Sequence, residues 1–92
     1  MIVKISDYGK IDEKYFVEYR VYGLSAEQMN FVNENLDDET VIFDEELMIK
    51  LYFSSELYPF QSDVAKLRLD DFFAREEIEM NIFLSSFLED ML

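Results

Sequence analysis

Hydrophobic and polar residues alternate along several short stretches of the chain, and this period of two is typical of half-buried β-strands. The clearest stretch is 15–22, in which Tyr15, Val17 and Tyr19 share one face. Residues 2–5 predict a shorter strand before it, and residues 7–10 have turn-forming chemistry. We therefore expect an antiparallel hairpin at the start of the chain.

A second hairpin is predicted in the middle of the chain. Residues 40–43 read as a short strand, the acidic residues 44–46 predict a turn, and apolar and polar positions alternate again over 47–53. Residues 54–62 contain the single proline, Pro59, and predict a loop.

Between the two hairpins the pattern changes to the 3.6-residue period of a helix. Gly23 ends the preceding strand, and Ser25 and Gln28 have the spacing of a capping box, in which each side chain bonds the other residue's backbone N–H. The helix is expected to end near Leu36. Its core-facing residues are Met29, Val32 and Leu36.

The last third of the chain predicts a second helix. Residues 64–69 are ambiguous, because they fit either a helical turn or an edge strand. After Asp70 the helical period is clear, and Ile78 and Ile82 are expected to widen its apolar stripe. The stripe itself consists of Met80, Phe83, Leu84, Phe87, Leu88 and Met91.

Together these elements predict an α+β fold with the order ββαββα. Its antiparallel sheet consists of two hairpins, one helix lies between them, and the C-terminal helix packs on the sheet. A chain of 92 residues has the length of one domain, 1–92.

Composition excludes several classes of protein. Half of the residues are hydrophobic and 16% are aromatic, so the chain is expected to fold despite its acidity. It contains no cysteine and no histidine, which removes disulfides, cysteine nucleophiles, histidine bases and the usual zinc sites. Nothing in it has the pattern of a signal peptide or a membrane span. We expect a soluble, cytoplasmic protein without a cofactor.

The formal net charge of −13 comes from two blocks of the chain. Residues 21–49 carry eight acids and no lysine or arginine, and residues 76–92 carry five acids and no base. The stretches 1–20 and 50–75 each carry four acids and four bases, which cancel. The blocks of −8 and −5 therefore account for the whole net charge.

Three kinds of chemistry fit this sequence poorly. The acidic runs lack the glycine and the ligand spacing of a calcium loop, so no metal site is expected. No acid lies in an apolar pattern suited to a catalytic carboxylate pair, so no enzymatic activity is expected. Direct binding to nucleic acid is disfavoured, because it depends on lysine and arginine side chains that neutralise phosphates.

The same charge suits the opposite role, which is to imitate a nucleic acid. Duplex DNA carries one charge per ~1.7 Å of its axis, and carboxylates two residues apart on a strand lie ~6.6 Å from each other. Arginines that bind phosphate bind carboxylates in the same bidentate geometry. The sequence therefore predicts a surface that binds a basic, nucleic-acid-binding protein. The contact residues predicted in the first block are Glu27, Glu34, Asp37, Asp38, Glu39, Asp44, Glu45 and Glu46, and a second patch is predicted at Glu76, Glu77 and Glu79.

In its size, its composition and the acids at 37–39 and 44–46, the chain resembles small acidic phage-encoded inhibitors that mimic DNA, including anti-CRISPR proteins. The resemblance implies a non-enzymatic inhibitor that keeps an RNA-guided CRISPR effector nuclease from its DNA.

Two alternatives remain open. An immunity protein that neutralises a nuclease toxin would share the small size and the acidity. A generic acidic interaction domain would instead bind a partner through aromatic residues, and charge reversal in the acidic turns would leave that binding intact. The aromatic candidates are Tyr15, Phe16, Tyr19 and Tyr22. The sequence leaves the oligomeric state undetermined.

Overall fold

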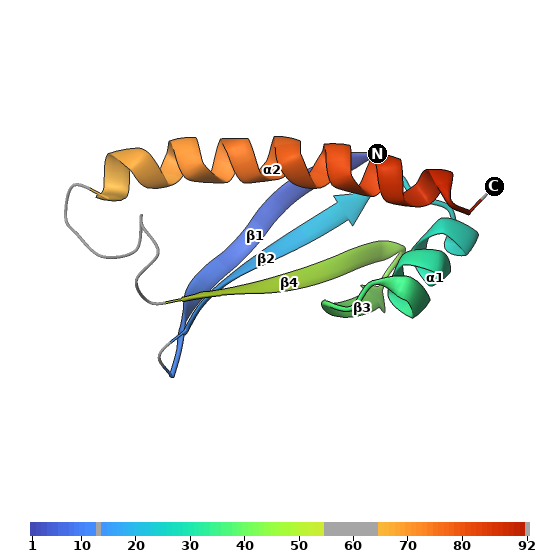
Figure 1. Cartoon of the computed structure of the whole chain (residues 1–92), viewed down its shortest axis with the longest axis horizontal. Helices are drawn as coiled ribbons and strands as arrows, with labels where there is room; N and C mark the ends of the chain where they lie inside the picture. Colours follow the sequence, from blue (N-terminus) through green and yellow to red (C-terminus); the bar gives the residue numbers. More distant parts are fainter. Residues whose placement is uncertain (13, 55–64, 92) are drawn as a thin grey trace.

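The computed structural model describes residues 1–12, 14–54 and 65–91, which form a four-stranded antiparallel sheet and two helices (Figure 1). The strands are β1 (Ile2–Ile11), β2 (Lys14–Tyr22), β3 (Glu39–Phe43) and β4 (Glu46–Ser54), and the helices are α1 (Ala26–Asn35) and α2 (Ala65–Glu89). The strands lie in the order β1-β2-β4-β3, so β1 and β3 are the two edges of the sheet. The predicted α+β class and the order ββαββα are confirmed.

The sheet has one face toward the core. α2 runs along this face, and α1 lies near one end of the sheet, in contact with β3 (Figure 1). The residues of β2 and β4 that are fully buried alternate along the strands, as the period of two predicts. They are Val17, Tyr19 and Val21 in β2 and Leu47 and Ile49 in β4. The residues between them, such as Arg20, Met48 and Lys50, are half-buried on the opposite face.

Both helices contribute to a single core. Met29 and Val32 of α1 are buried with Met80 and Leu84 of α2, and Leu36 is partly buried against them. The predicted capping box is confirmed. Ser25 Oγ accepts the Gln28 N–H at 3.1 Å, and Gln28 Oε1 accepts the Ser25 N–H at 2.9 Å, which satisfies two N–H groups at the start of α1.

The turn predicted at residues 7–10 is wrong, because β1 continues through them to Ile11. The register with β2 shifts between Ile5 and Asp7, so a β-bulge lengthens the strand by one residue and interrupts the alternation on which the prediction relied. Gly9 pairs with Phe16, and a Cβ at Gly9 would lie 2.9 Å from that ring. The glycine therefore makes room for an aromatic side chain on the neighbouring strand.

Two expectations for the C-terminal third are also revised. Residues 65–69 belong to α2, which resolves their ambiguity in favour of helix. Ile78 and Ile82 do not widen the buried stripe, because they are 62% and 65% exposed on a helix that has the sheet on only one side. Neither helix of the described chain has an apolar stretch sufficient to cross a bilayer. The loop predicted at 54–62 lies outside the described residues except for Ser54, which ends β4.

Candidate acidic interaction surface

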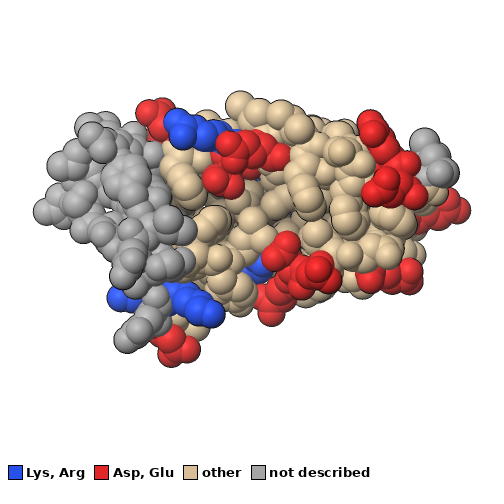
Figure 2. All heavy atoms as spheres, in the orientation of Figure 1, with Lys and Arg blue, Asp and Glu red and all other residues tan. Residues whose placement is uncertain are grey.

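Seven acids of the first block are exposed on consecutive elements, from α1 through the loop after it and β3 to the β3–β4 turn. We call this set the acidic end. It consists of Glu27, Glu34, Asp37, Asp38, Glu39, Asp44 and Glu45. On the face shown in Figure 2, red atoms lie over the part of the molecule where Figure 1 shows α1 and β3, and most of the blue atoms lie toward the other end.

Local contacts hold the elements of the acidic end together. The Thr40 hydroxyl in β3 donates a hydrogen bond of 2.7 Å to Asn33 Oδ1 in α1. Leu36 is the C-cap residue of α1 and has an extended backbone conformation. The helix therefore ends at this residue, and the chain continues directly into the acidic segment 37–39. The acids on α1 and β3 are thereby carried on packed secondary structure.

The turn between β3 and β4 has an unusual backbone for its residues. Asp44 and Glu45 have φ values of 49° and 64°, and positive φ at both central residues is the pattern of a type I′ turn. Such turns favour asparagine or aspartate followed by glycine, and glutamate in this region is uncommon. The tip of the hairpin thus exposes two carboxylates where glycine would fit the backbone more easily.

The described residues contain one ion pair, and it lies outside the acidic end. Arg20 in β2 and Glu46 in β4 approach to 3.2 Å on the sheet face opposite α2. Glu46 is therefore half-buried and paired, although the sequence grouped it with the first block. The acids of the acidic end are exposed and make no ion pair within residues 1–12, 14–54 and 65–91, although Glu39 lies opposite Lys50 in the β3–β4 ladder.

One acid of this set has a neutral partner. The Tyr52 hydroxyl donates a hydrogen bond of 3.1 Å to Glu39 Oε2, and this bond is the main reason that the pKa of Tyr52 is raised. The carboxylate is still exposed and keeps its charge available to a partner.

The second acidic block divides between structural and exposed positions. Glu76 accepts a hydrogen bond of 3.0 Å from the buried Tyr19 hydroxyl, and Glu77 accepts one of 2.7 Å from the Ile5 backbone N–H. Both carboxylates are half-buried, and both hold α2 to the sheet. Glu79 is exposed. Of the second patch predicted from the sequence, Glu79 is thus the residue whose carboxylate faces solvent.

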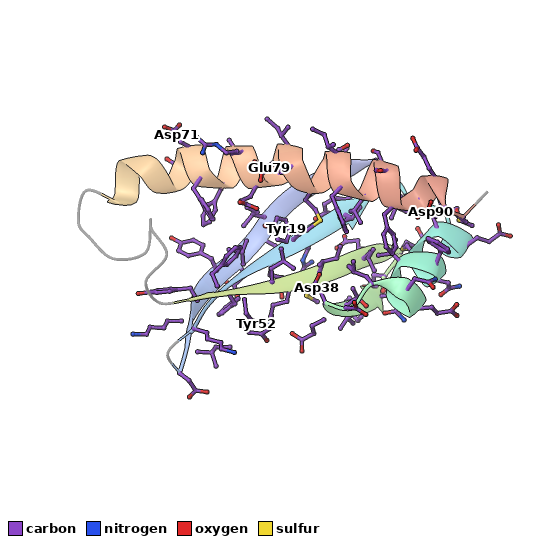
Figure 3. The ribbon with its side chains drawn as sticks, in the orientation of Figure 1. Tyr19, Asp38, Tyr52, Asp71, Glu79 and Asp90 are labelled. Carbon is purple, nitrogen blue, oxygen red and sulfur yellow. The ribbon has the colours of Figure 1, made fainter. Side chains whose placement is uncertain are left out.

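Glu79 extends the acidic end across the molecule. A hollow of about 230 Å³ between α2 and the sheet is lined by Asp38 from the first block and by Glu76 and Glu79 from the second. Leu51, Met80 and Phe83 form its apolar lining. Figure 3 shows Glu79 and Asp38 on either side of Tyr19 in this view. The sequence treated the two blocks as separate surfaces, and this hollow joins them.

The four aromatic residues that the sequence offered as an alternative binding surface are all at least partly buried. Tyr19 is fully buried and unable to contact a partner. Burial, followed by the charge and hydrogen bond of Glu76, raises the pKa of its hydroxyl well above the ordinary value of 10.0. Tyr15, Phe16 and Tyr22 are half-buried, and Lys50 Nζ lies 4.9 Å from the centre of the Phe16 ring.

The sequence did not identify one exposed feature, the apolar edge of the sheet. Val41, Ile42 and Phe43 in β3 are 48%, 36% and 64% exposed. The available signal was three consecutive apolar residues between two acidic runs, which alternation alone does not place at an edge or in the interior.

Groups of three or more acids that could hold a metal ion are absent from the described residues. A family profile described as "Family of unknown function (DUF5750)" matches residues 2–90. No curated protein matches the chain.

Proposed function

The chain belongs to DUF5750, a family of unknown function, and from its charged surface we propose that it is a non-enzymatic inhibitor that occupies the basic, nucleic-acid-binding surface of a partner protein. One observation carries the proposal. The cation-free interval 21–49 folds so that seven of its acids are exposed on neighbouring elements and make no ion pair within the described chain.

The acidic end offers the partner carboxylates in place of phosphates. Glu39 lies on a strand, Asp37 and Asp38 precede it, and Asp44 and Glu45 lie at the tip of the same hairpin. Successive side chains of a strand point to opposite faces, so carboxylates two residues apart lie ~6.6 Å from each other, which is about twice the axial rise of ~3.4 Å per phosphate of one DNA strand. Arginines of the partner would bind these carboxylates as they bind phosphate.

The partner that best fits this chemistry is a protein that reads duplex DNA through arginine side chains, such as a CRISPR effector nuclease at its short recognition motif. Occupation of that surface would exclude DNA without any chemical step. Association would be fast and would weaken as salt is added, because attraction between surface charges is screened.

The experiment compares two quadruple variants of equal charge. The first reverses Asp37, Asp38, Asp44 and Glu45 to lysine. The matched control reverses Asp7, Asp12, Asp70 and Asp71, which are also exposed but lie in β1, just after it and in α2. A partner is captured from a host lysate with the wild-type protein, identified by mass spectrometry and titrated by calorimetry at low and at physiological salt.

We expect the first variant to lose affinity by about 100-fold or more, since several charges at one interface are reversed together. The control should lose much less, and wild-type binding should weaken as salt rises. Duplex DNA should compete for the partner. Equal losses in the two variants, or wild-type affinity that is independent of salt, would contradict the proposal.

A further inference from the structure

β3 is an edge strand with unused backbone hydrogen-bonding groups. It pairs with β4 on one side, and no hydrogen bond to its backbone from any other described residue is present. Exposed edges of this kind are templates for the addition of another strand. Most folded proteins protect such edges, and the two edges of this sheet differ in that respect.

The turn geometry identifies the free groups. Phe43 and Glu46 flank the two-residue turn and form the hydrogen-bonded pair that closes it. Hydrogen-bonded and non-hydrogen-bonded pairs alternate along an antiparallel ladder, so Val41 and Glu39 also direct their N–H and C=O groups toward β4. The groups of Thr40 and Ile42 therefore point away from the sheet.

The opposite edge, β1, is protected. A bulge interrupts it between Ile5 and Asp7, and the Ile5 N–H is bonded to the Glu77 carboxylate of α2. Asn81 of the same helix donates a hydrogen bond of 3.4 Å to the Met1 carbonyl at the start of that edge. Within the described chain, β3 has neither a bulge nor a hydrogen bond from a helix side chain to its backbone. Its residues Val41 and Phe43 are instead 48% and 64% exposed.

Charge determines which strand this edge can accept. Asp38 and Asp44 lie just beyond the two ends of β3, whose five residues span roughly 17 Å. If a second copy paired antiparallel about Val41, Asp38 of each chain would face Asp44 of the other. Like charges that face each other across a ladder are destabilising, so a second copy is a poor occupant.

We infer that β3 accepts an extended segment of the partner protein as an added strand, with apolar residues beside Val41 and Phe43 and basic residues opposite the acids at both ends. The inference rests on the proposed function and makes it more specific. Main-chain hydrogen bonds from Thr40 and Ile42 supply part of the affinity, and the flanking acids select a basic segment.

The test uses the full chain and a short synthetic peptide of alternating valine and threonine between two pairs of lysines. The first control peptide has its valine and threonine backbone nitrogens methylated, so it keeps its charge but is unable to donate to an edge. The second control peptide has glutamine in place of lysine. Binding is followed by NMR, together with amide hydrogen exchange of residues 39–43.

In the free protein, the Thr40 and Ile42 amides should exchange faster than those of Val41 and Phe43. Saturation with the lysine peptide should slow them by about tenfold or more, and both controls should bind at least about tenfold more weakly. The Ile42→Pro variant removes an outward N–H without removing a bond to β4, and it should also lose peptide affinity. The methylated peptide tests the wild-type chain directly, so the result does not depend on how this variant folds.

Each other outcome contradicts a defined part of the inference. Equal binding of the lysine and methylated peptides would overturn strand addition and leave attraction by the acidic end intact. Equal binding of the lysine and glutamine peptides would overturn the inference that the added segment is basic, and with it the proposed function. A wild-type dimer in sedimentation that Ile42→Pro converts to monomer would show that a second copy occupies the edge, which would also overturn the inference.

Discussion

The Glu77 carboxylate accepts a hydrogen bond of 2.7 Å from the backbone N–H of Ile5, which lies 72 residues earlier in the chain. Ile5 is next to the β-bulge of β1, and Glu77 lies near the middle of α2. A bond between a carboxylate and a backbone N–H is stronger than one between neutral groups. This contact therefore joins the C-terminal helix to an edge of the sheet and protects that edge.

Replacement of Glu77 by alanine should lower the free energy of unfolding by about 1–2 kcal/mol, because a partly buried N–H loses its acceptor. Glu77→Gln keeps a carbonyl acceptor and should cost less. Urea unfolding followed by circular dichroism measures both. Glu79→Ala is the control, since Glu79 is exposed on the same helix and should change stability by less than about 0.5 kcal/mol. Equal effects at Glu77 and Glu79 would show that the Ile5 bond contributes little.

Tyr19 should make the protein less stable at alkaline pH. Burial and Glu76 raise the pKa of its hydroxyl, so the folded chain keeps this proton at a pH where the unfolded chain releases it. The stabilising contribution is complete below the unfolded value of about 10 and is lost as the pH rises toward the folded pKa. Unfolding measured across this range should show a fall in stability that is smaller in Tyr19→Phe.

Tyr19→Phe also tests the hydrogen bond to Glu76 at neutral pH. The variant leaves a half-buried carboxylate without its donor and should cost about 1–2 kcal/mol. Ultraviolet titration of the tyrosines gives a second readout, since one tyrosine of the wild type should ionise only with unfolding. If all tyrosines of the folded wild type titrate near pH 10, the buried assignment of Tyr19 is contradicted.

The cap of α1 should stabilise the helix that carries Glu27 and Glu34. Ser25→Ala removes the acceptor for the Gln28 N–H and should cost about 1 kcal/mol, whereas Ser25→Asp supplies another acceptor and should cost little. Thermal unfolding compares the two variants. A loss in Ser25→Asp as large as that in Ser25→Ala would mean that the hydroxyl acts through something other than the cap.

The parts of the fold that were predicted correctly depend on residues that are close to each other in the sequence. Val17, Tyr19 and Val21 are fully buried on one face of β2, so its alternation is regular, and the capping box joins residues three positions apart. β1 was harder to predict because a single bulge residue reverses the alternation, and because Gly9 accommodates the Phe16 ring instead of forming a turn. Such effects depend on the neighbouring strand and leave no periodic signal in the segment itself.

The sequence predicted the charge of the candidate site but did not predict which of its acids have structural roles. The charge of the acidic end follows directly from composition, and the exposure of Asp38 and Asp44 follows from their places beside strand ends. The structural roles of Glu76 and Glu77 could not be predicted, because their partners lie 57 and 72 residues away. Only the packing of α2 on the sheet distinguishes these two acids from Glu79.

The last prediction concerns a conflict between stability and binding at the β3–β4 turn. Glu45 has a φ of 64°, so Glu45→Gly should relieve backbone strain and raise the free energy of unfolding by about 0.5–1 kcal/mol. Glu45→Gln removes the same charge but keeps the strained backbone, so it should gain less. Both variants should bind the partner more weakly by similar factors. Chemical unfolding and calorimetry measure the two properties separately. If glycine and glutamine are equally stable, strain at the turn is not significant, and if neither weakens binding, the tip of the hairpin lies outside the interface.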